Sequence, residues 1–126
     1  MSEMRAAEFR RMVLGLDGAT EGAHMGHPDF RVNNRIFASL HGDDQLGMVA
    51  LTPEQQRRLI AEHPETFTPE SGAWGRAGST RVLLHAADEE AVGEALTLAW
   101  QNTIQKTKSK RAKPGASSRK RKRTKR

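Results

Sequence analysis

The distribution of charge along the chain most strongly limits what it can fold into. All fifteen acidic residues lie within residues 1–105, where only nine basic residues accompany them, so this part carries a formal charge of −6. Residues 106–126 hold the other twelve basic residues, including every lysine, and no acidic residue. They also lack aromatic and large aliphatic side chains. Because such a segment cannot bury enough apolar surface to offset its ordering entropy, the composition predicts a disordered tail behind a folded body.

The body has room for one hydrophobic core. The chain has 126 residues, of which 36% are hydrophobic, and this suits a single small domain. It contains no cysteine, which excludes disulfides and thiol chemistry and fits a reducing cytoplasm. No apolar run approaches the roughly 20 residues that a membrane helix needs. We therefore expect a cytoplasmic protein without a membrane partner, built from a domain over residues 1–105 and a disordered Lys/Arg-rich tail over residues 106–126.

Apolar spacing predicts a helix at the start of the body and strands after it. Ser2 can cap a first helix in which Phe9, Val13 and Leu16 share one face. Short β-prone runs separated by turn residues follow over residues 22–51. The connections between these runs are too short for parallel crossovers, so the sheet is expected to be antiparallel.

A two-residue hairpin turn is predicted at Asn33 and Asn34. Asparagine tolerates the positive φ angles that such a turn requires, and β-prone residues stand on both sides of the pair. A regular register around this turn would place Phe30 opposite Phe37.

The clearest helix start in the chain is at Thr52. A hydroxyl cap is followed by Pro53 in the first turn and by Gln55, which is placed to return the hydrogen bond of the cap. The helix is expected to run to about His63 and to end before Pro64.

The last part of the body adds a loop, a strand and a helix. Residues 64–78 contain two prolines and three glycines and form a connection long enough to be functional. Residues 79–85 predict a strand, and Asp88 caps a final helix with one apolar face. The resulting order, α, several β, α, β, α, predicts an α+β fold with a small antiparallel sheet and flanking helices.

Four short stretches of the body carry a family resemblance. They are Gly22–Val32, Ile36–Leu40, Leu51–Gln55, and Gly72–Gly78 with Thr80–Val82. In this order and spacing they resemble the MmcQ/YjbR family over about residues 5–103. The resemblance implies a compact α+β domain of the type known as CyaY-like, and a role in DNA binding. Similar proteins often carry a tryptophan where this chain has Ser79, so a ligand contact there would differ in this protein.

The glycine-rich loop around Trp74 is the first candidate binding site. An indole and the Arg76 guanidinium can stack on bases or hold phosphate, and glycines let a backbone approach a partner closely. The alternative is that Trp74 anchors the loop on the core. His27 and the strand arginines Arg31, Arg35 and Arg81 could extend the surface, although strand arginines often pair with nearby carboxylates instead.

A metal site at the histidines is not expected. His24, His27 and Asp29 are metal-ligating residue types. However, residues three apart on one strand face opposite sides, and no further ligand is clustered with them. No nucleophile is matched to the histidines either. We therefore expect neither a metal, a cofactor nor an enzymatic activity.

The tail is the strongest functional signal in the sequence. Its two basic clusters attract polyanions by releasing condensed counterions, but they have no geometry for reading bases. The candidate phosphate-binding residues of the tail are Lys106, Lys108, Lys110, Arg111, Lys113, Arg119, Lys120, Arg121, Lys122, Arg123, Lys125 and Arg126.

Together these features predict a nucleic-acid-binding protein, with DNA the expected partner and a monomer the expected state. The tail would supply nonspecific phosphate affinity, the folded body would supply any specificity, and a DNA partner would place the protein at the nucleoid. The alternative is a small-ligand or protein-interaction domain whose tail only localises it.

Overall fold

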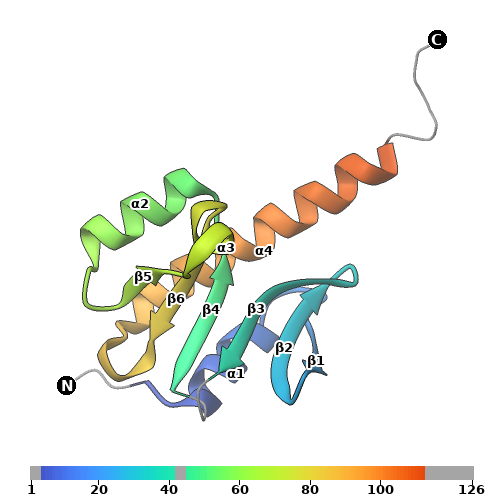
Figure 1. The fold of residues 1–126 in the computed structure, drawn as a ribbon. Helices are drawn as coiled ribbons and strands as arrows, with labels where there is room; N and C mark the ends of the chain where they lie inside the picture. The colour runs from blue at the N-terminus through green and yellow to red at the C-terminus, as the bar shows by residue number, and fades with distance from the viewer. Residues whose placement is uncertain (1–3, 42–44, 113–126) are drawn as a thin grey trace.

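The described residues contain six β-strands that form one sheet (Figure 1). The computed structural model describes residues 4–41 and 45–112. In chain order the strands are β1 (Thr20–His24), β2 (His27–Val32), β3 (Arg35–His41), β4 (Leu46–Ala50), β5 (Phe67–Pro69) and β6 (Ser79–Leu83). Their spatial order is β1-β2-β3-β4-β6-β5, and every neighbouring pair is antiparallel. The predicted antiparallel sheet is confirmed.

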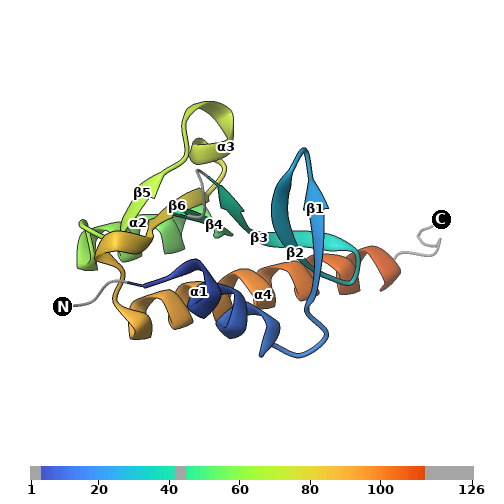
Figure 2. The same ribbon diagram turned by 90° about the horizontal axis from the view of Figure 1, so that it is seen from below.

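The helices α1 (Ala6–Leu14) and α4 (Glu89–Ala112) lie against one face of this sheet, and the short helix α3 (Gly72–Arg76) lies on the side of the other, open face (Figure 2). The chain also forms the helix α2 (Pro53–Glu62) and a 3₁₀ turn over Leu84–Ala86. The long helix α4 contacts β2, β3 and β4, and α1 packs against α4. An ion pair of 2.7 Å between Arg58 and Glu94 joins α2 to α4. The predicted α+β class with flanking helices is therefore confirmed.

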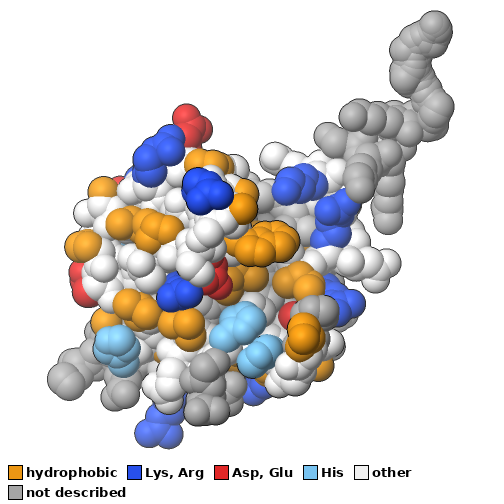
Figure 3. All heavy atoms as spheres, viewed as in Figure 1, with side chains coloured by type: hydrophobic (Ala, Val, Ile, Leu, Met, Phe, Trp, Pro, Cys, Tyr) orange, Lys and Arg blue, Asp and Glu red, His pale blue; other side chains and the backbone are white. Residues whose placement is uncertain are grey.

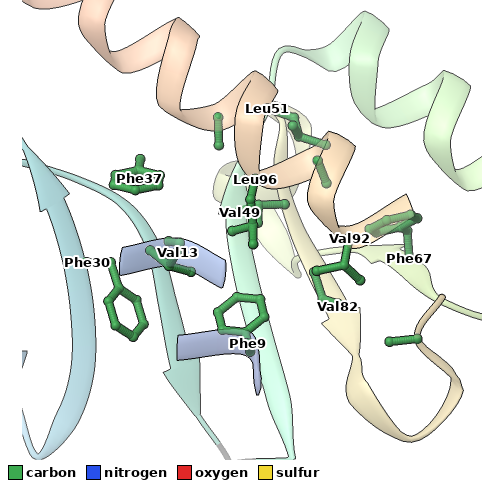
Figure 4. Close-up of a cluster of buried hydrophobic side chains, with 14 of the residues drawn as sticks. Phe9, Val13, Phe30, Phe37, Val49, Leu51, Phe67, Val82, Val92 and Leu96 are labelled. Atoms are coloured by element: carbon green, nitrogen blue, oxygen red, sulfur yellow. The ribbon is translucent and has the colours of Figure 1, made fainter. Parts of the chain in front are cut away.

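Side-chain alternation along the strands separates the core face from the open face. Val49 on β4 and Val82 on β6 are fully buried, whereas their neighbours Met48 and Arg81 are only half-buried. Met48 and Arg81 are cross-strand partners, so both belong to the open face. Figure 4 shows the buried side chains of α1, the central strands and α4 gathered in the core on the opposite side.

The predicted hairpin turn is confirmed, but the register beyond it is not. Asn33 and Asn34 have φ angles of 52° and 67°, as a two-residue turn of this type requires. A bulge between β2 and β3 then shifts the pairing by one residue, so Phe30 faces Ala38 rather than Phe37. The prediction of Phe30 opposite Phe37 is wrong because the bulge adds one residue on β3.

The predicted cap at Thr52 is confirmed. The first helix, in contrast, does not begin directly after the predicted cap Ser2. The Gln55 backbone N–H donates to Thr52 Oγ1 over 3.1 Å, and Gln55 Oε1 accepts from the Thr52 N–H over 3.0 Å. In α1 the N-cap position is Arg5, whose backbone N–H donates to Glu8 Oε1 over 2.8 Å. Ser2, the predicted cap, lies outside the described residues.

Three elements of the fold have no clear signature in the sequence. β5 and α3 occupy three and five residues inside the predicted loop over residues 64–78, too few for a periodic pattern to appear. β1 lacks alternating apolar residues because it lies at the edge of the sheet. The predicted strand over residues 79–85 ends at Leu83, where the 3₁₀ turn begins.

The helix α4 continues through residues 106–112, which composition alone predicted to be disordered. Thr107 is buried, and its Oγ1 accepts a hydrogen bond of 3.0 Å from the Asn33 side chain. Lysine, arginine and alanine are also good helix formers, so this part of the prediction is wrong for a physical reason. Residues 113–126 lie outside the described residues.

Candidate nucleic-acid interface

The structure describes the side chains of four of the five histidines of the chain. Two of them, His27 and His41, meet on the open face of the sheet. His24 and His27 flank a two-residue turn at Met25 and Gly26, whose φ angles are 52° and 82°. The register therefore places these histidines opposite each other on β1 and β2. Our expectation that they lie on opposite sides of one strand is wrong, because the turn puts them on two strands.

His27 lies against His41, which ends β3. The two imidazole rings are 4.8 Å apart between their centres and tilted by 50°. Ser39 Oγ lies 2.7 Å from Nε2 of His41. Burial and the neighbouring His27 lower the pKa of His41, and the carboxylate of Glu70 partly opposes this. The lowered pKa favours the uncharged form of the His41 ring.

Both strand arginines of the predicted site are paired with carboxylates. Arg31 donates from Nε and Nη2 to the two oxygens of Asp29, over 2.9 and 3.1 Å, and Asp29 is almost fully buried. Arg81 donates to Glu70 over 2.7 Å. A guanidinium has five N–H donors, so Arg31 keeps donors for another partner. The expectation that strand arginines pair with nearby carboxylates therefore holds at both Arg31 and Arg81.

Trp74 projects from the short helix α3 into solvent. Its side chain is 76% exposed, one of the largest exposed apolar surfaces among the described residues. The alternative that Trp74 anchors the loop on the core is therefore wrong. The neighbouring Arg76 is also exposed. An exposed indole is suited to stacking on a base or on another flat group, and an exposed guanidinium is suited to holding phosphate.

Two of the three glycines of this loop, Gly75 and Gly78, serve internal packing. A side chain at Gly75 would clash with the backbone of Glu70, and one at Gly78 would clash with the backbone of Leu51. Gly78 also has a φ of +115°, which residues with a side chain rarely adopt. The loop is thus closely packed, and it holds Trp74 in place rather than leaving room for a partner's backbone.

The buried side-chain amide of Gln56 holds the same loop by hydrogen bonds. Gln56 on α2 is 8% exposed, and its Nε2 donates to the carbonyl oxygens of Gly75 and Ser79, both over 3.0 Å. Nε2 also lies 3.2 Å from Thr80 Oγ1. These contacts join α2 to the residues that directly follow Trp74, from Gly75 to Thr80.

A basic hollow lies where the strands meet the C-terminal half of α4. It has a volume of about 320 Å³ and is lined by Arg31, Asn34, Arg35, Ile36, Ala50, Thr103 and Lys106. Its three basic side chains come from β2, β3 and α4. Within the described part of the chain, Arg35 and Lys106 form no ion pair. In Figure 3, Lys and Arg side chains lie beside the C-terminal half of α4, and others are spread over the rest of this face.

The structure distributes the predicted site residues over two regions. His27 and the exposed pair Trp74 and Arg76 come from opposite flanks of the open face (Figure 2). Arg31 and Lys106 meet in the basic hollow, and Lys108 is exposed further along α4. The other tail candidates lie in the last turns of α4, where side chains are not described, or outside the described residues: Lys110, Arg111, Lys113, Arg119, Lys120, Arg121, Lys122, Arg123, Lys125 and Arg126.

Sequence reasoning missed three residues of these regions: Ser39, His41 and Glu70 join the open face. Arg35, which the sequence offered as part of a basic strip, lies in the hollow. Only the alternation of β3, which puts Ser39 and His41 on one face, could have indicated the first two. In the residues that the structure describes, no three His, Asp or Glu side chains are arranged to hold a metal ion. Nor is any described helix long and apolar enough to cross a membrane.

The fold and the two regions define a small α+β domain in which α1 and α4 lie against one face of an antiparallel sheet. The profile of the YjbR family matches residues 14–102, so the chain belongs to the YjbR family and the resemblance is confirmed. A similar solved structure is that of the Deinococcus radiodurans protein DR2400, which carries the domain DUF419. It has a TM-score of 0.72 and 19% identity, and the match covers 95% of this chain and 96% of that one. At this identity it shows the shared fold alone. No curated protein matches the chain.

Proposed function

We propose that this protein binds nucleic acid, with DNA as the partner, and that the basic hollow is where the folded body contributes. The hollow joins Arg31 and Arg35 of the sheet to Lys106, the first of the twelve basic residues of the C-terminal stretch. This is the observation that carries the proposal. Without it, the body would present an excess of acidic groups to a polyanion, and only the C-terminal stretch would attract it.

The chemistry of the hollow suits a phosphodiester. Arg35 and Lys106 form no ion pair among the described residues, and Arg31 has N–H donors beyond those that Asp29 uses. Guanidinium groups hold phosphate oxygens in a fixed geometry, and a lysine adds a point charge. A phosphate held here would set the position of a strand on the body, whereas the residues beyond Lys106 would add attraction without position.

Trp74 and Arg76 would provide the selectivity of the body. Stacking of one base on an aromatic side chain contributes about 1–3 kcal/mol. The close packing of Gly75 and Gly78 and the hydrogen bonds of Gln56 keep the indole exposed in a fixed place. This reduces the entropy lost on binding. The proposal is for a binding function in the cytoplasm, at the nucleoid if DNA is the partner, and not for a catalytic one.

A truncated variant separates the contribution of the folded body to DNA binding from that of the basic C-terminal stretch. The variant should end at Ala112, because Thr107 is buried and bonded to Asn33, and an earlier end would damage the fold. This variant keeps four of the twelve basic residues after residue 105. With every charge engaged on duplex DNA, the slope of log K against log salt would change from about −11 to about −4.

Two charge variants of the truncated chain then test the hollow. We expect Arg35→Gln to weaken binding further, by about tenfold at low salt, which is about 1.4 kcal/mol. The matched control is Arg57→Gln, which removes an exposed charge on α2 that forms no described ion pair. Binding is measured by fluorescence anisotropy with labelled duplexes. Equal loss in both variants would mean that only overall charge matters, and no binding by the truncated chain would assign all affinity to residues 113–126.

The exposed Trp74 also favours a second candidate, a protein or small-ligand partner on the open face. In that case the C-terminal stretch would only localise the domain. Trp74→Ala would then leave DNA affinity unchanged, whereas the proposed stacking role predicts a loss of about tenfold or more.

A further inference from the structure

A pair of imidazoles on the open face has no role in the proposed nucleic-acid interface. His27 on β2 is exposed, and His41 on β3 is half-buried beside it. They come from neighbouring strands and not from one flexible loop, so the sheet holds their backbones at a fixed spacing. The register places the backbone of His24 on β1 directly opposite His27.

The spacing of the two rings fits a shared metal ion. Two imidazoles that bind one tetrahedral Zn²⁺, each through a nitrogen about 2.0 Å from the metal, have ring centres about 5 Å apart. The centres of the His27 and His41 rings are 4.8 Å apart, and their planes are tilted by 50° rather than stacked. This separation is therefore compatible with one nitrogen from each ring binding the same ion.

Ser39 orients one of these rings. Its Oγ lies 2.7 Å from Nε2 of His41, and the serine is 5% exposed. When Nε2 donates its hydrogen to this oxygen, Nδ1 carries the free lone pair of the ring. Metal-binding histidines commonly donate their second ring N–H to an oxygen in this way, which fixes the tautomer and the ring direction.

We propose that His27 and His41 bind a divalent transition metal ion of the Zn²⁺ and Cu²⁺ class, and that Ser39 is a positioning residue for His41. Imidazole ligands favour these ions over Mg²⁺ and Ca²⁺, which prefer oxygen. Two protein ligands leave coordination positions open to water or to a further donor. Glu70 is close enough to act on the charge of His41, so it favours a cation here, although Arg81 takes part of its charge.

The test is a titration of the full chain with Zn²⁺. The protein is prepared without a polyhistidine tag, stripped of metal and nucleic acid, and titrated with zinc chloride in a calorimeter. We expect one ion per chain, and a loss of affinity of at least tenfold in His27→Asn and in His41→Asn. The control is His85→Asn, which changes an exposed histidine of the 3₁₀ turn outside the pair and should bind as the unchanged protein does.

Ser39→Ala tests the positioning role. Loss of such a partner typically weakens metal affinity by about 10–100-fold. Nitrogen NMR shifts of the His41 ring should also report a change of tautomer in this variant, which a purely structural effect would not produce. An unchanged tautomer and affinity would overturn the role of Ser39.

The central proposal fails if Zn²⁺ and Cu²⁺ do not bind at millimolar concentration, or if both histidine variants bind as tightly as the control. His27 is exposed, so His27→Asn gives a readable result even if His41→Asn folds poorly. Because the assay contains no nucleic acid, its outcome is independent of the proposed function.

Discussion

Replacement of Gln56 by alanine should destabilise the protein far more than the loss of a polar side chain from the ten-residue helix α2 would suggest. The side chain is buried, and its amide links α2 to the segment that carries Trp74. The variant Gln56→Ala removes this link without changing charge or introducing a larger group. It therefore isolates the effect of the amide.

The hydrogen bonds of Gln56 give the size of the effect. Nε2 has two hydrogens and three acceptors within reach, which are the oxygens of Gly75, Ser79 and Thr80. Two net hydrogen bonds contribute about 1 kcal/mol each, and buried acceptors left without a donor cost more. We expect a loss of about 3 kcal/mol in the free energy of unfolding, or roughly 15 °C in melting temperature for a domain of this size.

The assay is urea unfolding followed by circular dichroism, with thermal melting as a second measure. Gln101→Ala is the matched control, because Gln101 is exposed on α4 and forms no described side-chain hydrogen bond. It should change the unfolding free energy by less than about 0.5 kcal/mol. Trp74 fluorescence anisotropy, read in a Trp100→Phe background, should fall in Gln56→Ala as the indole gains freedom.

A melting temperature for Gln56→Ala within about 2 °C of the control would refute this reasoning, since it lies far below the shift worked out above. It would mean that the tight packing of Gly75 and Gly78 alone holds the Trp74 segment. Lower stability with unchanged Trp74 anisotropy would separate the two roles, since the amide would then stabilise α2 without fixing the indole.

Three further predictions address other parts of the fold. In Gly78→Ala a residue with a side chain must adopt a φ of +115° and would clash with the backbone of Leu51. We expect the free energy of unfolding, measured in urea, to fall by more than about 2 kcal/mol. A smaller loss would mean that the loop can relax. Thr107→Val removes the hydrogen bond from Asn33 and should cost about 1 kcal/mol, with faster amide exchange confined to the end of α4. The folded state lowers the pKa of His41 from its ordinary 6.5, so its contribution to stability is full above pH 6.5 and is lost as pH falls through the lower folded value. Melting temperatures between pH 5 and 7 in EDTA should therefore fall less steeply in His41→Gln, and parallel curves would contradict this.

Local signals in the sequence were enough to predict most of the element order. The cap at Thr52 and the turn at Asn33 and Asn34 depend on a few adjacent residues, so their prediction needs no knowledge of the rest of the fold. The bulge beside Phe30 does not have such a signal. It arises because β2 and β3 must keep pairing while the sheet bends, and it moved the predicted partner by one residue.

The sequence by itself determined that one acidic body carries a basic C-terminal stretch, that the body is an α+β domain, and which family it belongs to. These conclusions follow from composition, local periodicity and short motifs, which are properties of neighbouring residues. The exposure of Trp74, the meeting of His27 with His41, and the joining of Arg35 to Lys106 were decided only by the tertiary structure. Each depends on segments that are distant in the chain and are brought together by strand pairing and helix packing, and no local pattern records that.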